Sequence, residues 1–98
     1  MKAIIIQGAS QTIELTEISG ADAIPDLVGQ ASIIADEVDA NNAVYFDEDC
    51  FIRGTEGRFQ IDSLAPIAGV AVILGGSGHA ATDTTLDPAA FADRVKFL

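Results

Sequence analysis

The apolar residues of this chain come in short, β-branched runs that stop at turn-forming residues, and this pattern restricts the fold more than any other feature. Runs of about four to eight such residues, bounded by glycine, asparagine or aspartate, predict β-strands. Residues 2–7 form one run. Residues 11–18 follow with alternating polar and apolar side chains, so the two segments predict an antiparallel hairpin. Residues 70–74 are entirely apolar and predict the central strand of a sheet. Further strands are expected over residues 31–38, 43–47 and 58–62.

One short helix is predicted over residues 22–29. Asp22 carries a side-chain acceptor suited to the amino end of a helix, and Pro25 is tolerated in the first turn. Gly29 can end the helix in a left-handed conformation. About two turns of helix are too short to be stable alone, so this element must be held by packing against the rest of the protein.

A second helix is predicted to begin at Asp87 and Pro88, an acceptor cap followed by proline at the first helical position. It is expected to continue toward the end of the chain, because Phe91 and Val95 lie four residues apart on one helical face. Residues 63–69 are apolar but irregular, and they are expected to pack against the core. Together these elements predict one α+β domain over residues 1–98, a mostly antiparallel sheet of about five to six strands with two short helices.

The charge of the chain is unevenly distributed. Fifteen acids and five bases give a net charge of −10. Residues 4–51 contain ten acids and neither lysine nor arginine, whereas the remainder contains five of each sign. Such a field disfavours direct contact with nucleic acid or an anionic membrane and favours a basic protein surface. Solubility, or adaptation to high salt, is the alternative explanation. The partner-binding candidates are Glu14, Asp22, Asp26, Asp47 and Asp49.

The second candidate region follows the predicted central strand and consists of Gly75, Gly76, Ser77, Gly78 and His79. A dinucleotide-binding loop would need a helix directly after these glycines, and residues 81–86 predict a returning strand instead. A phosphate-binding P-loop would need Lys-Ser or Lys-Thr after the glycines, and a nucleophile elbow would need glycine in place of His79. A polar hairpin tip is therefore favoured, and a ligand or enzyme pocket near Gly75–Gly78 and His79 is the alternative.

The sequence predicts no metal and no cofactor. Asp47, Glu48 and Asp49 resemble the start of an EF-hand loop, but Phe51 and Ile52 stand where that loop needs an oxygen ligand and a glycine. One cysteine and one histidine cannot complete a structural zinc site. A lone cysteine also excludes an internal disulfide and favours a reducing compartment, and no targeting or membrane-spanning segment is recognised. We therefore expect a cytoplasmic protein.

Several short blocks of this chain resemble a family of small phage and mobile-element proteins that is known only as a domain of unknown function. The blocks are "MKAIII", "DLVG", "VYFDEDC", "PIAG", "VAVILG" and the closing "LDPAAFADRVKFL". Gln30 departs from the family pattern where its first block has a second glycine, and Asp49-Cys50 stands where the family has Glu-Gly. The resemblance implies a phage- or plasmid-associated setting and supplies no catalytic residues.

Three functional hypotheses follow from these observations. The first is a non-enzymatic interaction protein, such as a host-takeover or anti-defence factor, whose carboxylates occupy a nucleic-acid-binding surface of a basic partner. The second is a small ligand-binding protein or enzyme with its pocket near the glycine-rich segment. The third is a homo-oligomeric structural protein that associates through an exposed sheet edge or residues 63–69.

Overall fold

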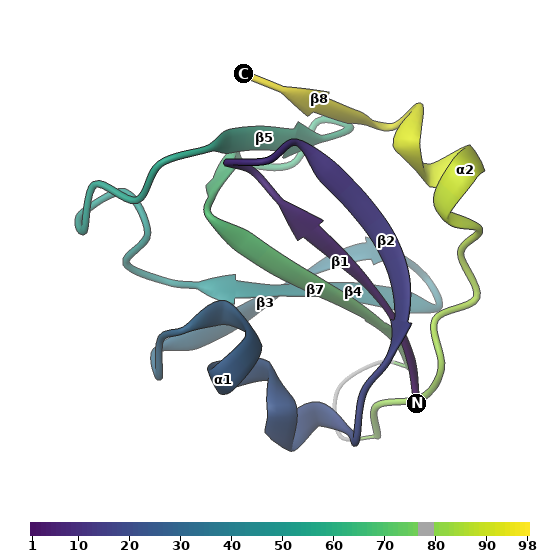
Figure 1. Ribbon diagram of the computed structural model, residues 1–98. Helices are drawn as coiled ribbons and strands as arrows, with labels where there is room; N and C mark the ends of the chain where they lie inside the picture. The colour runs from purple at the N-terminus through teal and green to yellow at the C-terminus, as the bar shows by residue number, and fades with distance from the viewer. Residues whose placement is uncertain (77–79) are drawn as a thin grey trace.

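The computed structural model describes residues 1–76 and 80–98, and in this part of the chain two antiparallel sheets and two short helices stack in three layers (Figure 1). The strands are β1 (Lys2–Gln7), β2 (Thr12–Glu17), β3 (Ile33–Asp39), β4 (Asn42–Asp47), β5 (Arg58–Ile61), β6 (Ile67–Ala68), β7 (Val70–Gly75) and β8 (Val95–Phe97). The helices are α1 (Ile24–Val28) and α2 (Pro88–Ala92), and a 3₁₀ turn (Ala21–Ala23) precedes α1.

The larger sheet has the strand order β2-β1-β7-β4-β3, and every pair of neighbours is antiparallel. β7 is the central strand, as its uninterrupted apolar sequence predicts. β1 and β2 form the predicted hairpin, with Lys2 opposite Glu17 and Gln7 opposite Thr12. β3 and β2 are the two edges of the sheet, so each presents backbone groups on its outer side.

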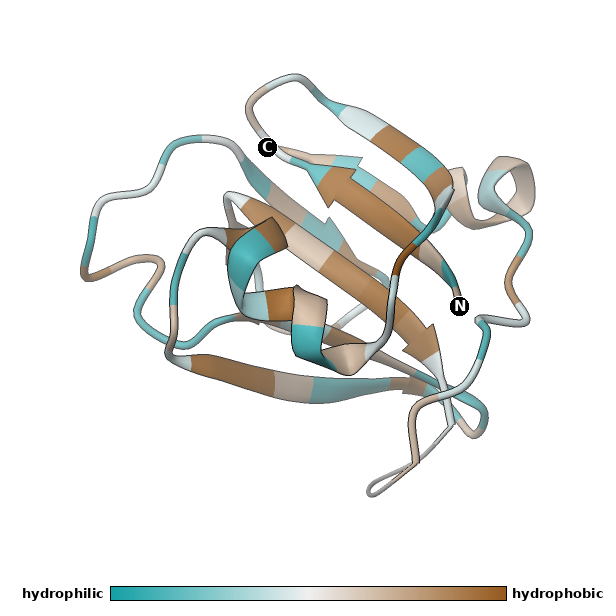
Figure 2. Ribbon diagram, turned by 60° about the horizontal axis from the view of Figure 1, so that its bottom comes forward, coloured by the Kyte–Doolittle hydropathy of each residue, from teal (hydrophilic) through white to brown (hydrophobic). Residues whose placement is uncertain are grey.

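Both faces of this sheet are apolar, because successive side chains of a strand point to opposite sides. Ile4 and Ile6 of β1 face the smaller sheet, β6-β5-β8, and the core between the two sheets also contains Phe59, Ile61 and Phe91. On the other face α1 lies against the sheet (Figure 2). Its Ile24 belongs to a buried cluster that also contains Ala3, Val72 and Leu74. The α1 side of the larger sheet and the side that carries the smaller sheet are thus distinct surfaces of the molecule.

Three glycines allow the two sheets to meet closely. Gly69 lies between β6 and β7 with φ of 90°, so the chain passes from one sheet directly into the other. The Gly8 N–H donates to the Gly69 carbonyl at 2.8 Å, and the Gly69 N–H donates to the Gly57 carbonyl at 2.9 Å. A Cβ on Gly8 would lie 2.0 Å from the Gly57 carbonyl oxygen, so this crossing has no space for a side chain.

The first predicted helix is present, but its amino end differs from the prediction. α1 begins at Ile24 after the 3₁₀ turn, and Gly29 ends it with φ of 83°. Asp22 makes no side-chain capping bond to either element, so its predicted capping role is wrong. The reason is that the 3₁₀ turn already begins at Ala21, which places Asp22 inside the turn.

The second predicted helix is shorter than expected. The Asp87 carboxylate caps α2 by accepting the Ala90 N–H at 3.1 Å, as predicted. The helix ends at Ala92, however, and residues 95–97 form β8 against β5. Val95 and Phe97 pack against the core, and Lys96 between them is exposed, which is the alternation of a strand. The four-residue spacing of Phe91 and Val95 therefore does not reflect a continuous helix.

The predicted returning strand over residues 81–86 is wrong, because only Thr82 bridges to Gly75 and the rest of this segment is irregular. Conversely, Ile67 and Ala68 form β6 within the segment that was expected to be irregular.

The prediction of an α+β fold with mostly antiparallel pairing and two short helices is confirmed. The strand count is corrected to eight strands in two sheets over the described residues. Neither helix there has the length and hydropathy needed to span a membrane.

Candidate functional site

Three of the predicted partner-binding residues are exposed on the α1 side of the molecule. Asp22 lies in the 3₁₀ turn and Asp26 in the first turn of α1. Glu14 of β2 is opposite Ile5, whose side chain packs against the α1-side core, so Glu14 also faces the α1 side. By the same register, Glu37 of β3 is opposite Ala43 and shares the face of Tyr45. We call these four exposed carboxylates, Glu14, Asp22, Asp26 and Glu37, the α1-side acidic face.

Asp47 and Asp49, the other two predicted residues, are engaged within the protein. Asp47 is 3% exposed, and its carboxylate accepts the Arg53 Nε–H at 2.9 Å and the Asp49 N–H at 3.0 Å. Asp49 lies 3.8 Å from the same guanidinium. These bonds fix the loop that follows β4, so we assign Asp47 and Asp49 to loop structure and leave them out of the proposed binding surface.

Gly75 and Gly76, the first two residues of the glycine-rich segment, are held close to a neighbouring part of the backbone. A Cβ on Gly75 would lie 2.1 Å from the Asp83 carbonyl oxygen, and a Cβ on Gly76 would lie 2.1 Å from the Ala80 carbonyl oxygen. These glycines therefore let residues 80–83 pass directly over the end of β7. Gly76 also contributes to the hollow described next. Ser77, Gly78 and His79 lie outside the described residues.

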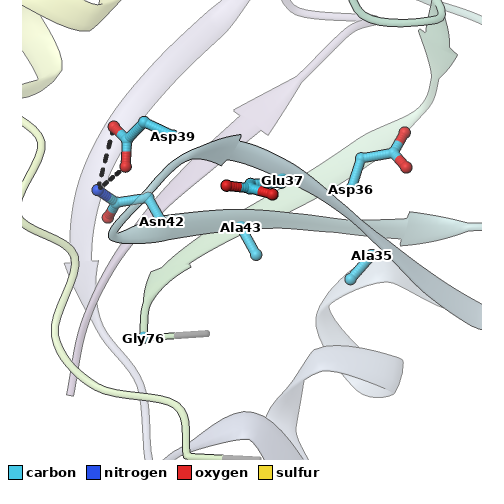
Figure 3. A pocket seen from close by; sticks show the side chains of 7 residues that line it. All are labelled: Ala35, Asp36, Glu37, Asp39, Asn42, Ala43 and Gly76. Atoms are coloured by element: carbon cyan, nitrogen blue, oxygen red, sulfur yellow. Dashed lines mark hydrogen bonds between the residues drawn. The ribbon is translucent and has the colours of Figure 1, made fainter. Parts of the chain in front are cut away.

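A hollow of about 250 Å³ opens beside the hairpin formed by β3 and β4 (Figure 3). Its lining consists of Ala35, Asp36, Glu37, Asp39, Asn42, Ala43 and Gly76, and we call it the acidic hollow. Two alanines and a glycine leave the space open. Glu37 lies on the same sheet face as Ala35 and Ala43 and supplies the charge there, whereas Asp36 and Asp39 border the hollow from the other face of the hairpin. This combination suits a cationic or mixed apolar and cationic group, because a carboxylate pairs favourably with an ammonium or guanidinium.

A buried amide organises the end of the acidic hollow. Asn42 is 1% exposed, and its Oδ1 accepts the Thr84 hydroxyl at 2.8 Å and the Thr85 N–H at 3.2 Å. Its Nδ2 donates to the Thr85 hydroxyl at 2.8 Å and to the Asp39 carboxylate at 3.1 Å. The network is fully satisfied, and it joins the hairpin to the segment that leads into α2.

The same network keeps Asp39 ionised. Burial alone would raise the pKa of Asp39, but its carboxylate accepts the Asn41 N–H at 2.8 Å as well as the Asn42 amide. These hydrogen bonds, with a smaller contribution from the charge of Arg94, hold the pKa below its usual value. Asp39 is therefore a permanent negative charge in the acidic hollow at neutral pH.

The bases lie away from the α1-side acidic face. Arg53 pairs with Asp47, and Arg94 donates to Asp62 through Nε and Nη2, at 3.0 and 2.6 Å to Oδ2. The hydrogen bonds from Arg94 lower the pKa of Asp62, and the reciprocal interaction raises the pKa of Arg94. Arg58 and Lys96 belong to β5 and β8 of the smaller sheet. Among the described residues, the four carboxylates of the α1-side acidic face form no ion pair.

Asp36, Glu37 and Asp39 were not among the predicted binding residues. The sequence places them in a strand and at its end, but their position around one hollow depends on β3 being an edge strand next to β4. The available signal was three acids within four residues directly before the turn at Asn41. In the part of the chain that the structure describes, no three potential metal ligands converge.

Comparisons with protein-family models, with curated proteins and with solved structures found no match to this chain.

Proposed function

We propose that this protein is a non-enzymatic interaction factor of phage or plasmid type that binds a basic protein surface through its α1-side acidic face. The single observation that carries the proposal is that Glu14, Asp22, Asp26 and Glu37 are exposed on one side of the molecule. The partner class is a nucleic-acid-binding protein, because its basic groove would accept carboxylates in the place of phosphates.

The spacing of these carboxylates supports an extended rather than a point contact. β2 and β3 are the opposite edges of a five-stranded sheet, so Glu14 and Glu37 are separated by four strand spacings, about 19 Å. Asp22 and Asp26 lie on the elements that cross this face between the edges (Figure 2). A surface of this width covers several phosphate positions along one DNA strand, which are spaced about 3.4 Å apart.

The test is capture of proteins from a bacterial lysate by the tagged chain at low and at high salt. The variant Glu14→Lys, Asp22→Lys, Asp26→Lys reverses three charges on the α1-side acidic face. The matched control, Glu48→Lys, Glu56→Lys, Asp93→Lys, makes the same change in net charge at exposed acids elsewhere. Long-range steering depends on where the charges lie, so the two variants separate a directed surface from a general effect of net charge.

We expect the unaltered chain and the control to retain the same basic nucleic-acid-binding proteins, and the α1-side variant to lose them. High salt should weaken the retention, because exposed charges are screened over a distance of about 8 Å at physiological ionic strength. Equal binding by the two variants would contradict the proposal, as would a captured set without basic proteins. Circular dichroism spectra of the variants establish that both remain folded.

A further inference from the structure

The loop after β4 presents two apolar side chains to solvent from a fixed backbone. Phe51 is 49% exposed and Ile52 is 87% exposed, whereas the preceding Cys50 is 2% exposed. The loop is closed by hydrogen bonds from the Arg53 N–H to the Asp49 carbonyl at 2.9 Å and from the Thr55 N–H to the Cys50 carbonyl at 3.1 Å. An ordered loop with a buried anchor loses little conformational freedom on binding, which favours its use as a contact.

Phe51 belongs to a patch that extends onto the outer face of the smaller sheet. The Arg58 guanidinium lies over the Phe51 ring, with Cζ 5.6 Å from the ring centroid. Leu98 is 58% exposed and donates its N–H to the Arg58 carbonyl, so the two are cross-strand neighbours. Lys96 is exposed on the same side of β8, two residues away. We call Phe51, Ile52, Arg58, Lys96 and Leu98 the apolar–basic patch.

Arg58 and Lys96 give the apolar–basic patch its positive charge. Among the described residues, no carboxylate lies within ion-pair distance of Arg58 or Lys96. Exposed aromatic and arginine side chains that stack on each other are typical anchors of protein interfaces. The acidic composition of the rest of the chain makes an anionic membrane an unfavourable partner for this patch.

The acidic hollow supplies a complementary surface on the same chain. Its alanines and glycine leave a space of about 250 Å³, and Glu37 on the same sheet face supplies the opposite charge, with Asp36 and Asp39 adding negative charge from the other face of the hairpin. The hollow borders the start of β4, and the loop that carries Phe51 leaves the end of β4. About 17 Å of extended strand separates the two sites, which lie toward opposite ends of the hairpin (Figure 1). One molecule cannot bring them together, but two molecules can.

We propose that copies of this chain associate head to tail, with the apolar–basic patch of one copy seated in the acidic hollow of the next. Phe51 or Ile52 enters the space beside Ala35 and Ala43, and Arg58 pairs with the carboxylates at the rim. Because the two surfaces differ, the contact is heterologous and extends to a ring or a filament rather than stopping at a symmetric dimer. This inference and the proposed function share Glu37, but their tests alter different residues, so the failure of one is distinguishable from the failure of the other.

Light scattering coupled to size exclusion, from micromolar to millimolar protein, measures the association. The mass of the unaltered chain should rise with concentration. Ile52→Asp on the patch and Ala35→Trp in the hollow should each weaken association about tenfold or more. Leu15→Asp is the matched control, since it makes the same kind of change at an exposed apolar residue of β2, outside both surfaces, and should leave association unchanged.

Mixing the two variants gives the sharpest test. The Ile52→Asp chain keeps an intact hollow, and the Ala35→Trp chain keeps an intact patch, so an equimolar mixture should form a 1:1 dimer and nothing larger. A mixture that stays monomeric under conditions where the unaltered chain associates overturns the proposal. A monomeric unaltered chain at millimolar concentration also overturns it. A monomer that sediments with neutral phosphatidylcholine vesicles through Ile52 overturns it as well, in favour of a lipid contact.

Discussion

At the scale of single residues, the Asn42 side chain joins the hairpin of β3 and β4 to the segment before α2. It satisfies the Thr84 hydroxyl and the Thr85 N–H, and it donates to Asp39. Replacing Asn42 with alanine removes the acceptor of the buried Thr84 hydroxyl and of the Thr85 N–H. We expect a loss of about 1–3 kcal/mol in the free energy of unfolding at neutral pH, measured by urea denaturation.

The same substitution should raise the pKa of Asp39, because it removes a hydrogen bond to the ionised carboxylate. A carboxyl whose pKa is lowered on folding stabilises the protein above its unfolded pKa, and this contribution is lost as the pH falls through the folded pKa. The difference in the free energy of unfolding between the unaltered protein and the Asn42→Ala variant should therefore become smaller as the pH falls below 3.8, the usual pKa of an aspartate. Carbon-detected NMR titration measures this pKa directly. The same Asp39 pKa in the unaltered protein and in the variant would contradict the assigned network.

At the scale of elements, the fold depends on glycine for two separable reasons, one at the crossing of the two sheets and one at the end of α1. Gly8 has no side-chain space, since a Cβ would lie 2.0 Å from the Gly57 carbonyl oxygen. Gly29 has open space around it but a φ of 83°. Gly8→Ala should cost about 3 kcal/mol through displaced backbone, whereas Gly29→Ala should cost only about 1 kcal/mol of left-handed strain. Thermal unfolding of both variants checks which substitution costs more stability, and a larger loss of stability for Gly29→Ala than for Gly8→Ala would contradict this prediction.

Local patterns predicted the features that depend on residues close together in the sequence. The hairpin of β1 and β2, the central position of β7 and the Asp87 cap of α2 all follow from residues within a few positions of one another. β8 was not predictable in this way, because its pairing with β5 joins residues 95–97 to residues 59–61. The irregular path of residues 80–86 likewise depends on the distant Asn42.

The candidate surfaces were predictable only in part for the same reason. Glu14, Asp22 and Asp26 were identified from the uneven charge, and the structure places them on one side of the molecule. The sequence did not indicate that Asp47 would be buried against Arg53, since the turn that brings them together has no strong signature. The acidic hollow requires the register of β3 against β4, which is a property of the assembled sheet.

At the scale of the whole molecule, concentrating like charges on one face opposes folding. Asp22 and Asp26 are four residues apart on consecutive turns, and the bases that form ion pairs lie elsewhere. Neutralising Glu14, Asp22 and Asp26 as Glu14→Gln, Asp22→Asn, Asp26→Asn should therefore raise the Tm by about 2–4 °C at low salt. The gain should shrink near physiological ionic strength, where charges more than about 8 Å apart are screened.

The matched variant Glu48→Gln, Glu56→Gln, Asp93→Asn removes the same number of charges from other parts of the surface. If the repulsion is concentrated on the α1-side acidic face, this control should raise the Tm less than the first variant does. Differential scanning calorimetry at two salt concentrations separates the two cases. Equal increases in Tm for the two variants would mean that the repulsion depends on net charge alone. The α1-side acidic face would then destabilise the protein no more than acids elsewhere on the surface. Unequal gains would show that this face is kept acidic at the expense of stability, as a binding surface would be.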